Sequence, residues 1–158
     1  MKNGDKTKIR VLKLSEIEEG FQLIGEVFQE FVAPYYTKEG IDTFYEEFIR
    51  GERFRGKFVS KKEVMYGAFI EDRLVGVLSL SVKNMVSCVF IKDGYHRMGI
   101  GRKLFYIIME ELRNKGVKRI TLNSSPYAIS FYHNIGFTDI GMQTSYKGIV
   151  YTPMELLI

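Results

Sequence analysis

The segment 89–103 constrains the fold of this chain more than any other, because it joins an apolar strand to a helix through two closely spaced glycines. Met85–Ile91 is a nearly unbroken apolar run, typical of a strand covered on both faces, so we expect it to be central in its sheet. Gly99 and Gly101 then open a segment whose apolar residues recur at helical spacing. This junction predicts an α/β protein in which a buried strand leads directly into a helix.

The same junction is a candidate binding site for phosphate groups. Without Cβ atoms, Gly99 and Gly101 would let an anion approach the main chain, and the helix N-terminus adds about half a positive charge. The side chains of Arg97, Arg102 and Lys103 could contact an outlying phosphate. The spacing fits neither the Walker loop nor the dinucleotide fingerprint. A tight turn with solvated basic side chains is the alternative.

Composition bounds the remaining possibilities for this chain of 158 residues. No linker, repeat or low-complexity tract divides it, so residues 1–158 are expected to form a single domain. No apolar run approaches the roughly 20 residues that span a bilayer, and Met1–Lys8 lacks the apolar core of a secretory signal, so we expect a cytoplasmic protein without membrane contact. Cys88 as the single cysteine excludes a disulfide framework, and two histidines argue against a protein-built metal site. A net charge of +4 favours an anionic ligand but does not by itself indicate nucleic acid.

Two helices are expected ahead of the main strands. Ile9–Leu14 alternates as a half-buried strand does, and Ser15 with Glu18 forms a capping-box pattern that would open the first helix. A second amphipathic helix is expected over residues 38–50. The segment 52–62 is rich in glycine and positive charge and has no periodicity, so it predicts a loop. Its charge is the basis of one alternative function, the binding of RNA or DNA.

The order of the later elements defines the sheet. The further strands are expected, in chain order, at Val64–Ile70, Leu74–Val82, Arg119–Asn123, 137–142 and 149–156. A helix beginning at Ile100 separates the central strand from the third of these, and this order predicts a right-handed parallel crossover. A short helix with Ser125 as its cap and Pro126 at its first position follows. The resulting architecture is an α/β sandwich with a mixed sheet.

The glycine junction resembles the signature of the GNAT superfamily of N-acetyltransferases, which is Gln or Arg, two residues, Gly, one residue, then Gly or Ala. That stretch here reads His96-Arg97-Met98-Gly99-Ile100-Gly101, with His96 in the Gln/Arg position. The resemblance implies that these residues, with Arg102 and Lys103, bind the diphosphate of acetyl-CoA mainly through main-chain N–H groups. It also implies that the main chain of Val89, Phe90 and Ile91 lines the pantetheine arm, where one N–H polarises the thioester carbonyl.

A second segment resembles the same family. Residues 128–137 read Ala-Ile-Ser-Phe-Tyr-His-Asn-Ile-Gly-Phe, similar to the family pattern Ala-x-x-Phe-Tyr followed by Gly-Phe. In the family, the tyrosine that matches Tyr132 protonates the departing CoA thiolate. Without the resemblance, Tyr132 would be interpreted as an amphipathic core residue. Asn123 and Ser125 could hydrogen-bond the pantetheine amides, or they could only end a strand and cap a helix.

The acceptor side of the resemblance is less specific. The family builds its acceptor pocket where this chain has the aromatic residues Phe28, Phe31, Tyr35 and Tyr36. Periodicity alone would place the phenylalanines in the core. Some members carry a glutamate near the start of the fourth strand, where this chain has Met85, Val86 and Ser87. We therefore expect the amine to lose its proton through water, with Glu30 or Glu46 as a candidate helper.

Taken together, the resemblance implies an α/β, GNAT-like fold with a mixed, mostly antiparallel central sheet of about seven strands flanked by about four helices. It implies an enzyme that moves the acetyl group of acetyl-CoA to a small-molecule or peptide primary amine by direct attack in a ternary complex, without a metal or a nucleic-acid partner. A catalytically silent CoA-binding sensor or interaction module of the same fold is the alternative. Because the final strands of such folds often pair across a two-fold axis, a homodimer is expected.

Overall fold

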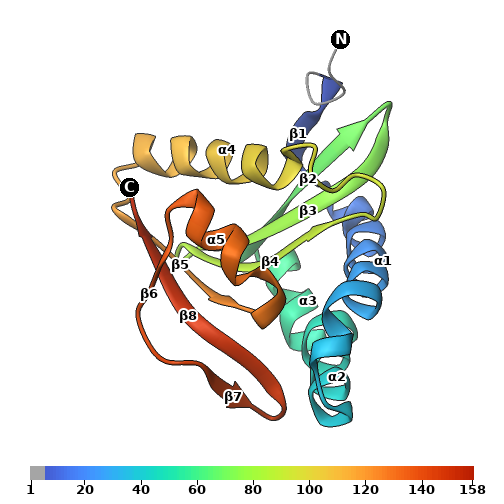
Figure 1. The fold of residues 1–158 in the computed structure, drawn as a ribbon. Coiled ribbons are helices and arrows are strands. Elements are labelled where there is room, and N and C mark those ends of the chain that lie inside the picture. The colour runs from blue at the N-terminus through green and yellow to red at the C-terminus, as the bar shows by residue number, and fades with distance from the viewer. Residues whose placement is uncertain (1–5) are drawn as a thin grey trace.

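The computed structural model describes residues 6–158, which form an eight-stranded sheet with helices on both faces (Figure 1). The expectation drawn from Met1–Lys8 rests largely on residues 1–5, which lie outside the described range. The strand order is β1-β2-β3-β4-β5-β8-β6, and β7 pairs with β8. Within residues 6–158, β4 and β5 are parallel and the other pairs are antiparallel. The predicted mixed, mostly antiparallel α/β fold is confirmed, with eight strands instead of about seven.

The elements follow the predicted order, with α3 and β7 in addition and with the strand expected at 137–142 shortened to two residues. The strands are β1 (Lys8–Val11), β2 (Glu63–Ile70), β3 (Arg73–Ser81), β4 (Met85–Ile91), β5 (Arg119–Ser124), β6 (Thr138–Asp139), β7 (Thr144–Tyr146) and β8 (Ile149–Leu157). The α-helices are α1 (Ile17–Val27), α2 (Lys38–Phe44), α3 (Glu52–Val59), α4 (Ile100–Asn114) and α5 (Ile129–Ile135). One π-helical turn prolongs α1 over Phe28–Val32, and another prolongs α2 over Tyr45–Ile49. No helix in the described range is both long and apolar enough to span a membrane.

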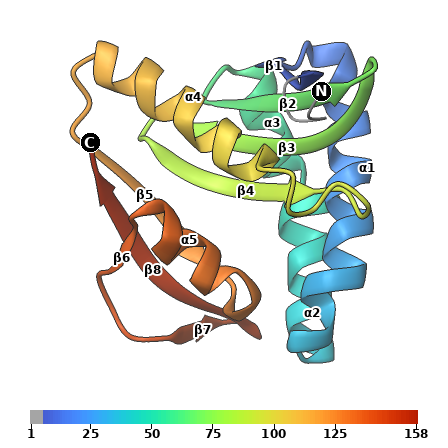
Figure 2. The same cartoon turned by 45° about the horizontal axis from the view of Figure 1, so that its top comes forward.

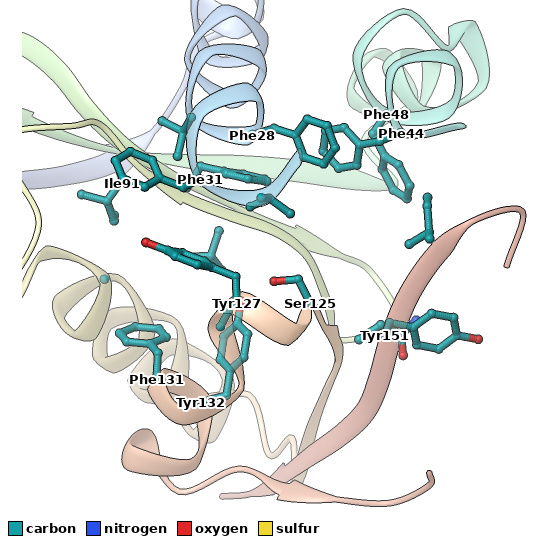
Figure 3. Close-up of a pocket in the computed structure, with 18 of the residues that line it drawn as sticks. Phe28, Phe31, Phe44, Phe48, Ile91, Ser125, Tyr127, Phe131, Tyr132 and Tyr151 are labelled. Carbon is teal, nitrogen blue, oxygen red and sulfur yellow. The ribbon is translucent and has the colours of Figure 1, made fainter. Parts of the chain in front are cut away.

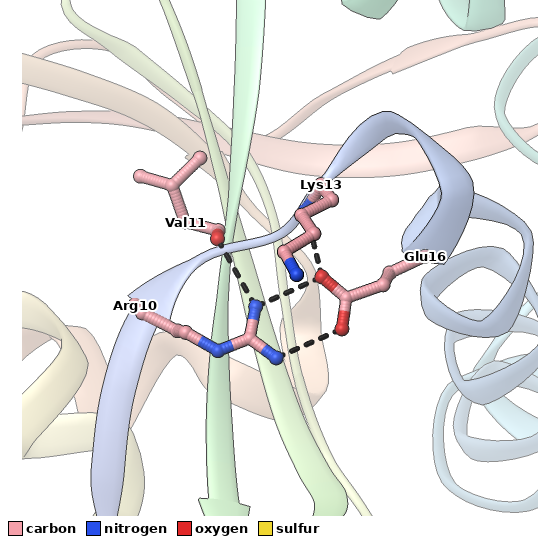
Figure 4. Close-up of polar contacts among 4 residues, drawn as sticks. All are labelled: Arg10, Val11, Lys13 and Glu16. Carbon is pink, nitrogen blue, oxygen red and sulfur yellow. Dashed lines mark hydrogen bonds and ion pairs between the residues drawn. The ribbon is translucent and has the colours of Figure 1, made fainter.

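The chain enters α1 through a different cap from the predicted one (Figure 4). The pairing of Ser15 with Glu18 was wrong, because the carboxylate that closes the turn belongs to Glu16. It accepts a hydrogen bond of 2.8 Å from the main-chain N–H of Lys13 and two more of 2.8 Å from the guanidinium of Arg10. The Arg10 hydrogen bond, followed by the Lys13 N–H, lowers the pKa of Glu16 to about 2. The first turn is thus fixed by a charged contact with β1.

Helix α3 forms where the sequence predicted a loop. Its apolar side consists of Phe54 and Phe58, whose rings meet Phe21 edge to face with centroids 5.9 and 5.7 Å apart. Two inward-facing apolar residues in one short helix are too few for periodicity to show, so packing on α1 decides the conformation. The positive charge of this segment is partly used inside the domain, since Arg55 pairs with Glu18 and lies 4.1 Å from the centroid of the Phe21 ring.

Two hydrophobic clusters fill the two faces of the sheet. Helices α1, α2 and α3 cover one face, where Phe21, Ile24 and Phe28 are almost fully buried. Helix α4 lies across the other face with Leu104 and Ile108, and α5 packs beside it (Figure 2). Each helix thus presents its apolar side to the sheet, as amphipathic spacing requires.

Strands β4 and β5 pair over only two residues before they separate (Figure 2). Met85 pairs with Thr121 and Val86 with Leu122, whereas β4 continues along β3 as far as Ile91. From Val89 onward, the other edge of β4 has no strand partner within residues 6–158. Strand β4 is central in the sheet, as predicted, but it is not buried along its whole length, because its far end lines a cavity.

Candidate active site

A cavity of about 1350 Å³ begins where β4 and β5 separate and extends to the side chains of α1, α2 and α3 (Figure 3). Its walls include the end of β4, the loop before α4, the first turn of α5 and the start of β8. Pockets for single small ligands usually hold about 300 to 1,000 Å³. The cavity therefore has room for two reactants side by side.

The loop between β4 and α4 is built to present main-chain N–H groups. Gly94, Arg97 and Gly99 all adopt positive φ, at 87°, 62° and 77°. A left-handed residue among right-handed ones turns successive N–H groups toward a common point, which is an anion-binding arrangement. Gly99 is the N-cap of α4, and a Cβ added there would meet no atom within 4 Å. The space in front of the helix N-terminus is open, as a diphosphate site requires.

Gly101 has a packing role in addition to the binding role predicted for it. A Cβ at this position would lie 2.9 Å from the ring of Phe131 on α5. Its missing side chain lets α5 approach α4. Both glycines belong to the cavity wall, and only at Gly99 would an added Cβ meet open space.

His96 connects the loop to the end of β4. Its Nε2 atom lies 2.7 Å from the carbonyl oxygen of Ile91, and its ring meets Phe31 edge to face at 4.7 Å between centroids. His96, Arg97, Ile100 and Arg102 all line the cavity. Met98 and Lys103, which were predicted with them, lie outside its wall. Met98 instead packs against the core beneath α4, and the main-chain N–H of Lys103 bonds the carbonyl of Gly99.

The unpaired edge of β4 faces the start of α5 across the cavity. Val89, Phe90 and Ile91 line one side, with Asn123 and Ser125 on the other. Ser125 occupies the N-cap of the 3-10 turn Pro126–Ala128, as predicted, but its side chain makes no capping hydrogen bond. Within residues 6–158, the edge of β4 that faces this side has no strand partner beyond Val86, and the carbonyl of Ile91 on it is in contact with His96.

Tyr132 lies in the cavity wall and is only 7% exposed. It projects from α5 and meets the rings of Phe105 and Phe137, each at 5.8 Å between centroids. Burial, and secondarily the nearby Cys88, raises the pKa of Tyr132 above its ordinary value of 10. Burial also raises the pKa of the Cys88 thiol to about 12. At neutral pH the tyrosine is thus a phenol that can donate a proton, and the cysteine is an inert thiol.

The predicted acceptor residues divide into two groups. Phe28, Phe31 and Tyr36 line the cavity, and the hydroxyl of Tyr36 donates a hydrogen bond of 3.5 Å to the carbonyl of Val150 in β8. Tyr35 is outside the wall, 58% exposed, with its ring 5.9 Å from that of Tyr127. The 3-10 turn Ala33–Tyr35 points adjacent side chains in different directions, which separates the two tyrosines.

Several lining residues were not found from the sequence. They include Phe54, Tyr127, Tyr146, Ile149 and Tyr151. Phe54 was missed because α3 was interpreted as a loop. Ile149 and Tyr151 alternate along β8 and so lie on one face of that strand, which was the pattern that could have indicated them. It did not indicate which face of the strand meets the cavity.

The carboxylates considered as helpers for deprotonation also differ in placement. Glu46 lines the cavity but is paired with Arg50 at 2.7 Å, whereas Glu30 is exposed and lies outside the wall. In the part of the chain that the structure describes, no group of three or more His, Cys, Asp or Glu residues comes together as a metal site would need.

Solved structures of N-acetyltransferases share this fold over almost the whole chain. A GCN5-related N-acetyltransferase from Rhodopseudomonas palustris aligns with a TM-score of 0.85 at 14% identity, over 97% of this chain and 96% of that one. The PaiA N-acetyltransferase from Thermoplasma acidophilum, solved with coenzyme A, aligns with a TM-score of 0.79 at 22% identity, over 96% and 99%. The spermidine N-acetyltransferase from Vibrio cholerae, solved with CoA and spermine, gives a TM-score of 0.66 at 15% identity, over 97% and 96%.

The sequence itself places the chain in a family. Residues 32–158 match the acetyltransferase (GNAT) domain, so the chain belongs to the GNAT acetyltransferase family. An uncharacterized N-acetyltransferase ycf52-like protein from Prochlorococcus marinus is 36% identical over 50 residues. That alignment covers 32% of this chain and 28% of the relative. The family resemblance inferred from the two motifs is confirmed.

Proposed function

We propose that this protein transfers the acetyl group of acetyl-CoA to a primary amine by direct attack in a ternary complex, with Tyr132 as the general acid. The observation that supports this most strongly is the position of Tyr132, a buried phenol in the wall of the same cavity as the unpaired edge of β4. The PaiA structure was solved with coenzyme A and the Vibrio cholerae enzyme with CoA and spermine, which supports a CoA donor and an amine acceptor.

The residues of one wall fit the donor. The diphosphate would bind the N–H groups of the loop 96–102 at the N-terminus of α4, with Arg97 and Arg102 beside it. The amides of the pantetheine arm would pair with those main-chain groups of Val89–Ile91 that face away from β3 and are not in contact with His96, opposite Asn123 and Ser125. A strand edge without a partner is suited to this, because it offers N–H and C=O groups in regular alternation.

The reaction would then proceed with one proton donated and one released. The lone pair of the neutral amine attacks the thioester carbonyl carbon, forming the C–N bond, and an N–H group of β4 stabilises the oxyanion. Collapse of the intermediate breaks the C–S bond, and the sulfur takes the proton of the Tyr132 hydroxyl. The amine nitrogen gives its extra proton to water. Of the two predicted helpers, Glu46 lies in the wall and could accept it, although its ion pair with Arg50 weakens it as a base.

Replacing Tyr132 tests the mechanism. Tyr132→Phe removes the proton donor while keeping the ring contacts, so kcat should fall by about 100-fold or more while the affinity for acetyl-CoA is retained. Thiol release measured on a panel of amines, with calorimetry for acetyl-CoA, separates the two effects. Tyr45→Phe is the matched control, since Tyr45 lies outside the cavity wall and its hydroxyl bonds Gln29. An unchanged kcat in Tyr132→Phe would remove the acid role.

The same assays distinguish the alternative function. Saturable acetyl-CoA binding without turnover on any amine would favour a CoA-binding sensor or interaction module. Absence of binding at millimolar acetyl-CoA would refute the donor assignment itself.

We further propose that the protein acts in the cytoplasm as a single domain and as a homodimer. Support for the dimer comes from the C-terminal strands, where β6 forms the end of the strand order and β7 pairs with β8 alone. An outer strand with free main-chain groups is able to pair with a second copy. Sedimentation velocity should give the mass of two chains, and a monomer at all concentrations would contradict it.

A further inference from the structure

One side of the cavity is an aromatic wall, which extends from Phe31, beside His96, to β8. This aromatic wall consists of the half-buried side chains of Phe31, Tyr36, Phe48, Phe90, Ile149 and Tyr151. The buried rings of Phe28 and Phe44, stacked at 3.8 Å between centroids, lie directly behind it (Figure 3). Half-buried rings around a cavity leave apolar surface in contact with water until a ligand covers it. The aromatic wall is therefore complementary to an apolar group.

Charged side chains near the aromatic wall do not make it strongly negative. Those from α2, its extension and α3 are the carboxylates Glu46, Glu47 and Glu52 and the cations Arg53 and Lys57. Glu46 is paired with Arg50, and Glu47 accepts a hydrogen bond of 3.0 Å from the hydroxyl of Tyr146. An acceptor with several positive charges needs a matching set of carboxylates with no other cation nearby. The lining does not supply one.

Hydrogen-bonding groups are also few along the aromatic wall. The Tyr36 hydroxyl already bonds the carbonyl of Val150, and Figure 3 shows the Tyr151 hydroxyl directed away from the centre of the cavity. A polyhydroxylated amine would lose its water contacts there without gaining partners, and each such group carries a desolvation penalty.

We propose that the acceptor is a small primary amine with an apolar, preferably aromatic, body and no second charge. This inference rests on the proposed function, in which the amine attacks a thioester held at the unpaired edge of β4. The cavity is continuous from that edge to the aromatic wall, so the body lies against the rings while the amine reaches Val89–Ile91. 2-Phenylethylamine is the simplest amine with these properties.

A panel of four amines tests the class. Thiol release from acetyl-CoA should give a kcat/KM for 2-phenylethylamine about 100-fold above that for ethylamine, because burying a phenyl ring contributes that much binding. Spermidine and glucosamine represent the oligocationic and polyhydroxylated classes, and both should be no better than ethylamine. Equal rates for 2-phenylethylamine and ethylamine, or faster transfer to spermidine or glucosamine, would overturn the proposal.

Substitution of Phe48 tests the wall itself. Phe48→Ala should lower kcat/KM for 2-phenylethylamine about 10-fold and leave ethylamine within twofold. Phe48→Leu keeps most of the apolar volume and should lower kcat/KM for 2-phenylethylamine about threefold. This variant replaces Phe48→Ala in the test if the alanine variant does not fold. Val59→Ala, at an exposed position on α3, is the matched control. Equal losses for both amines would contradict the assignment of Phe48 to the acceptor body.

Binding measured without turnover separates this inference from the proposed function. In the presence of CoA, line broadening in the proton NMR spectrum of 2-phenylethylamine should reveal binding that Phe48→Ala weakens. Binding without acetyl transfer would refute the proposed function and leave the ligand class standing. Transfer to all four amines at similar rates would support the proposed function and refute the ligand class.

Discussion

The two walls of the cavity are built from different parts of the polypeptide. The donor wall uses main-chain groups from one continuous stretch, the end of β4 and the loop that enters α4. The aromatic wall uses side chains from the π-helical turns that prolong α1 and α2, from the segment between them, and from β4 and β8, which are far apart in the sequence. A site made of main chain depends on backbone conformation, whereas a site made of side chains depends on how separate elements pack. Substitutions should therefore affect the two walls through different physical effects.

The largest effect is expected where the aromatic wall is held in place. A Cβ on Gly40 of α2 would collide with the main chain of Gly148 in the turn between β7 and β8. Gly40→Ala should cost about 3 kcal/mol and lower the Tm by roughly 6–12 °C, because neither backbone can yield cheaply. Calorimetric unfolding measures this. Gly56→Ala in α3, where an added Cβ meets nothing within 4 Å, should be neutral or stabilising. If Gly40→Ala were as mild as Gly56→Ala, the close main-chain approach of Gly40 to Gly148 would not matter for stability. Side-chain contacts alone would then position α2 against β8.

The donor wall should respond to backbone strain instead. Gly99→Ala forces a side chain into φ of +77° at a cost of about 1 to 2 kcal/mol, and the Kd of acetyl-CoA should rise about 10-fold. Gly116→Ala imposes the same strain at φ of +81° after α4, away from the cavity, and should lose stability without changing the Kd. Calorimetric titration and thermal unfolding of both variants provide the readout. A similar Kd increase in both would mean that global destabilisation, not loop geometry, controls donor binding.

A smaller, pH-dependent effect is expected under α3, behind the aromatic wall. Glu63 is 2% exposed, and neither carboxylate oxygen has a well-formed hydrogen bond within residues 6–158, although the hydroxyls of Ser79 and Ser87 are near. Burial raises its pKa above 4.5, and those hydroxyls and Lys57 offset this only in part. Below pH 4.5 the Glu63 carboxyl is protonated in both the folded and the unfolded chain. As pH rises, it ionises first in the unfolded chain, so the free energy of unfolding decreases.

Glu63→Gln has the neutral charge of the protonated acid, so its stability should not decrease as pH rises through this range. The variant should match the parent near pH 4 and be more stable by about 1 kcal/mol at pH 7. Urea unfolding at several pH values would show the divergence. A variant less stable than the parent at pH 7 would mean that the ionised carboxylate is satisfied in the folded protein.

The smallest effect is expected at Glu16, outside both walls. Because its pKa falls to about 2, its stabilising contact with Arg10 is present above pH 4.5 and is lost as pH falls through about 2. Glu16→Gln should lower the Tm slightly at pH 7, with no difference left near pH 2. Donor affinity and turnover should be unchanged, so a loss of either would extend the site to the first turn of α1.

The predictions that succeeded were those carried by local patterns. Gly99, the helix starting at Ile100 and the strand Met85–Ile91 lie within one short segment, and the structure has them as expected. Tyr132 was found through a contiguous motif and lies in the cavity wall. Contacts between distant segments were the source of error. The separate role of Gly101 follows from Phe131, thirty positions further along, and the conformation of α3 follows from Phe21.

The sequence by itself determined the order of strands and helices apart from α3 and β7, the glycine junction and the family, because alternation, helical spacing and missing Cβ atoms act between near neighbours. Only the tertiary structure decided that Tyr36 and not Tyr35 lines the cavity, that β4 and β5 separate after Val86, and that rings from four elements form one wall. Those features depend on packing between elements distant in the chain, and the free energy of such packing comes from the shape of the assembled core, which no local pattern records.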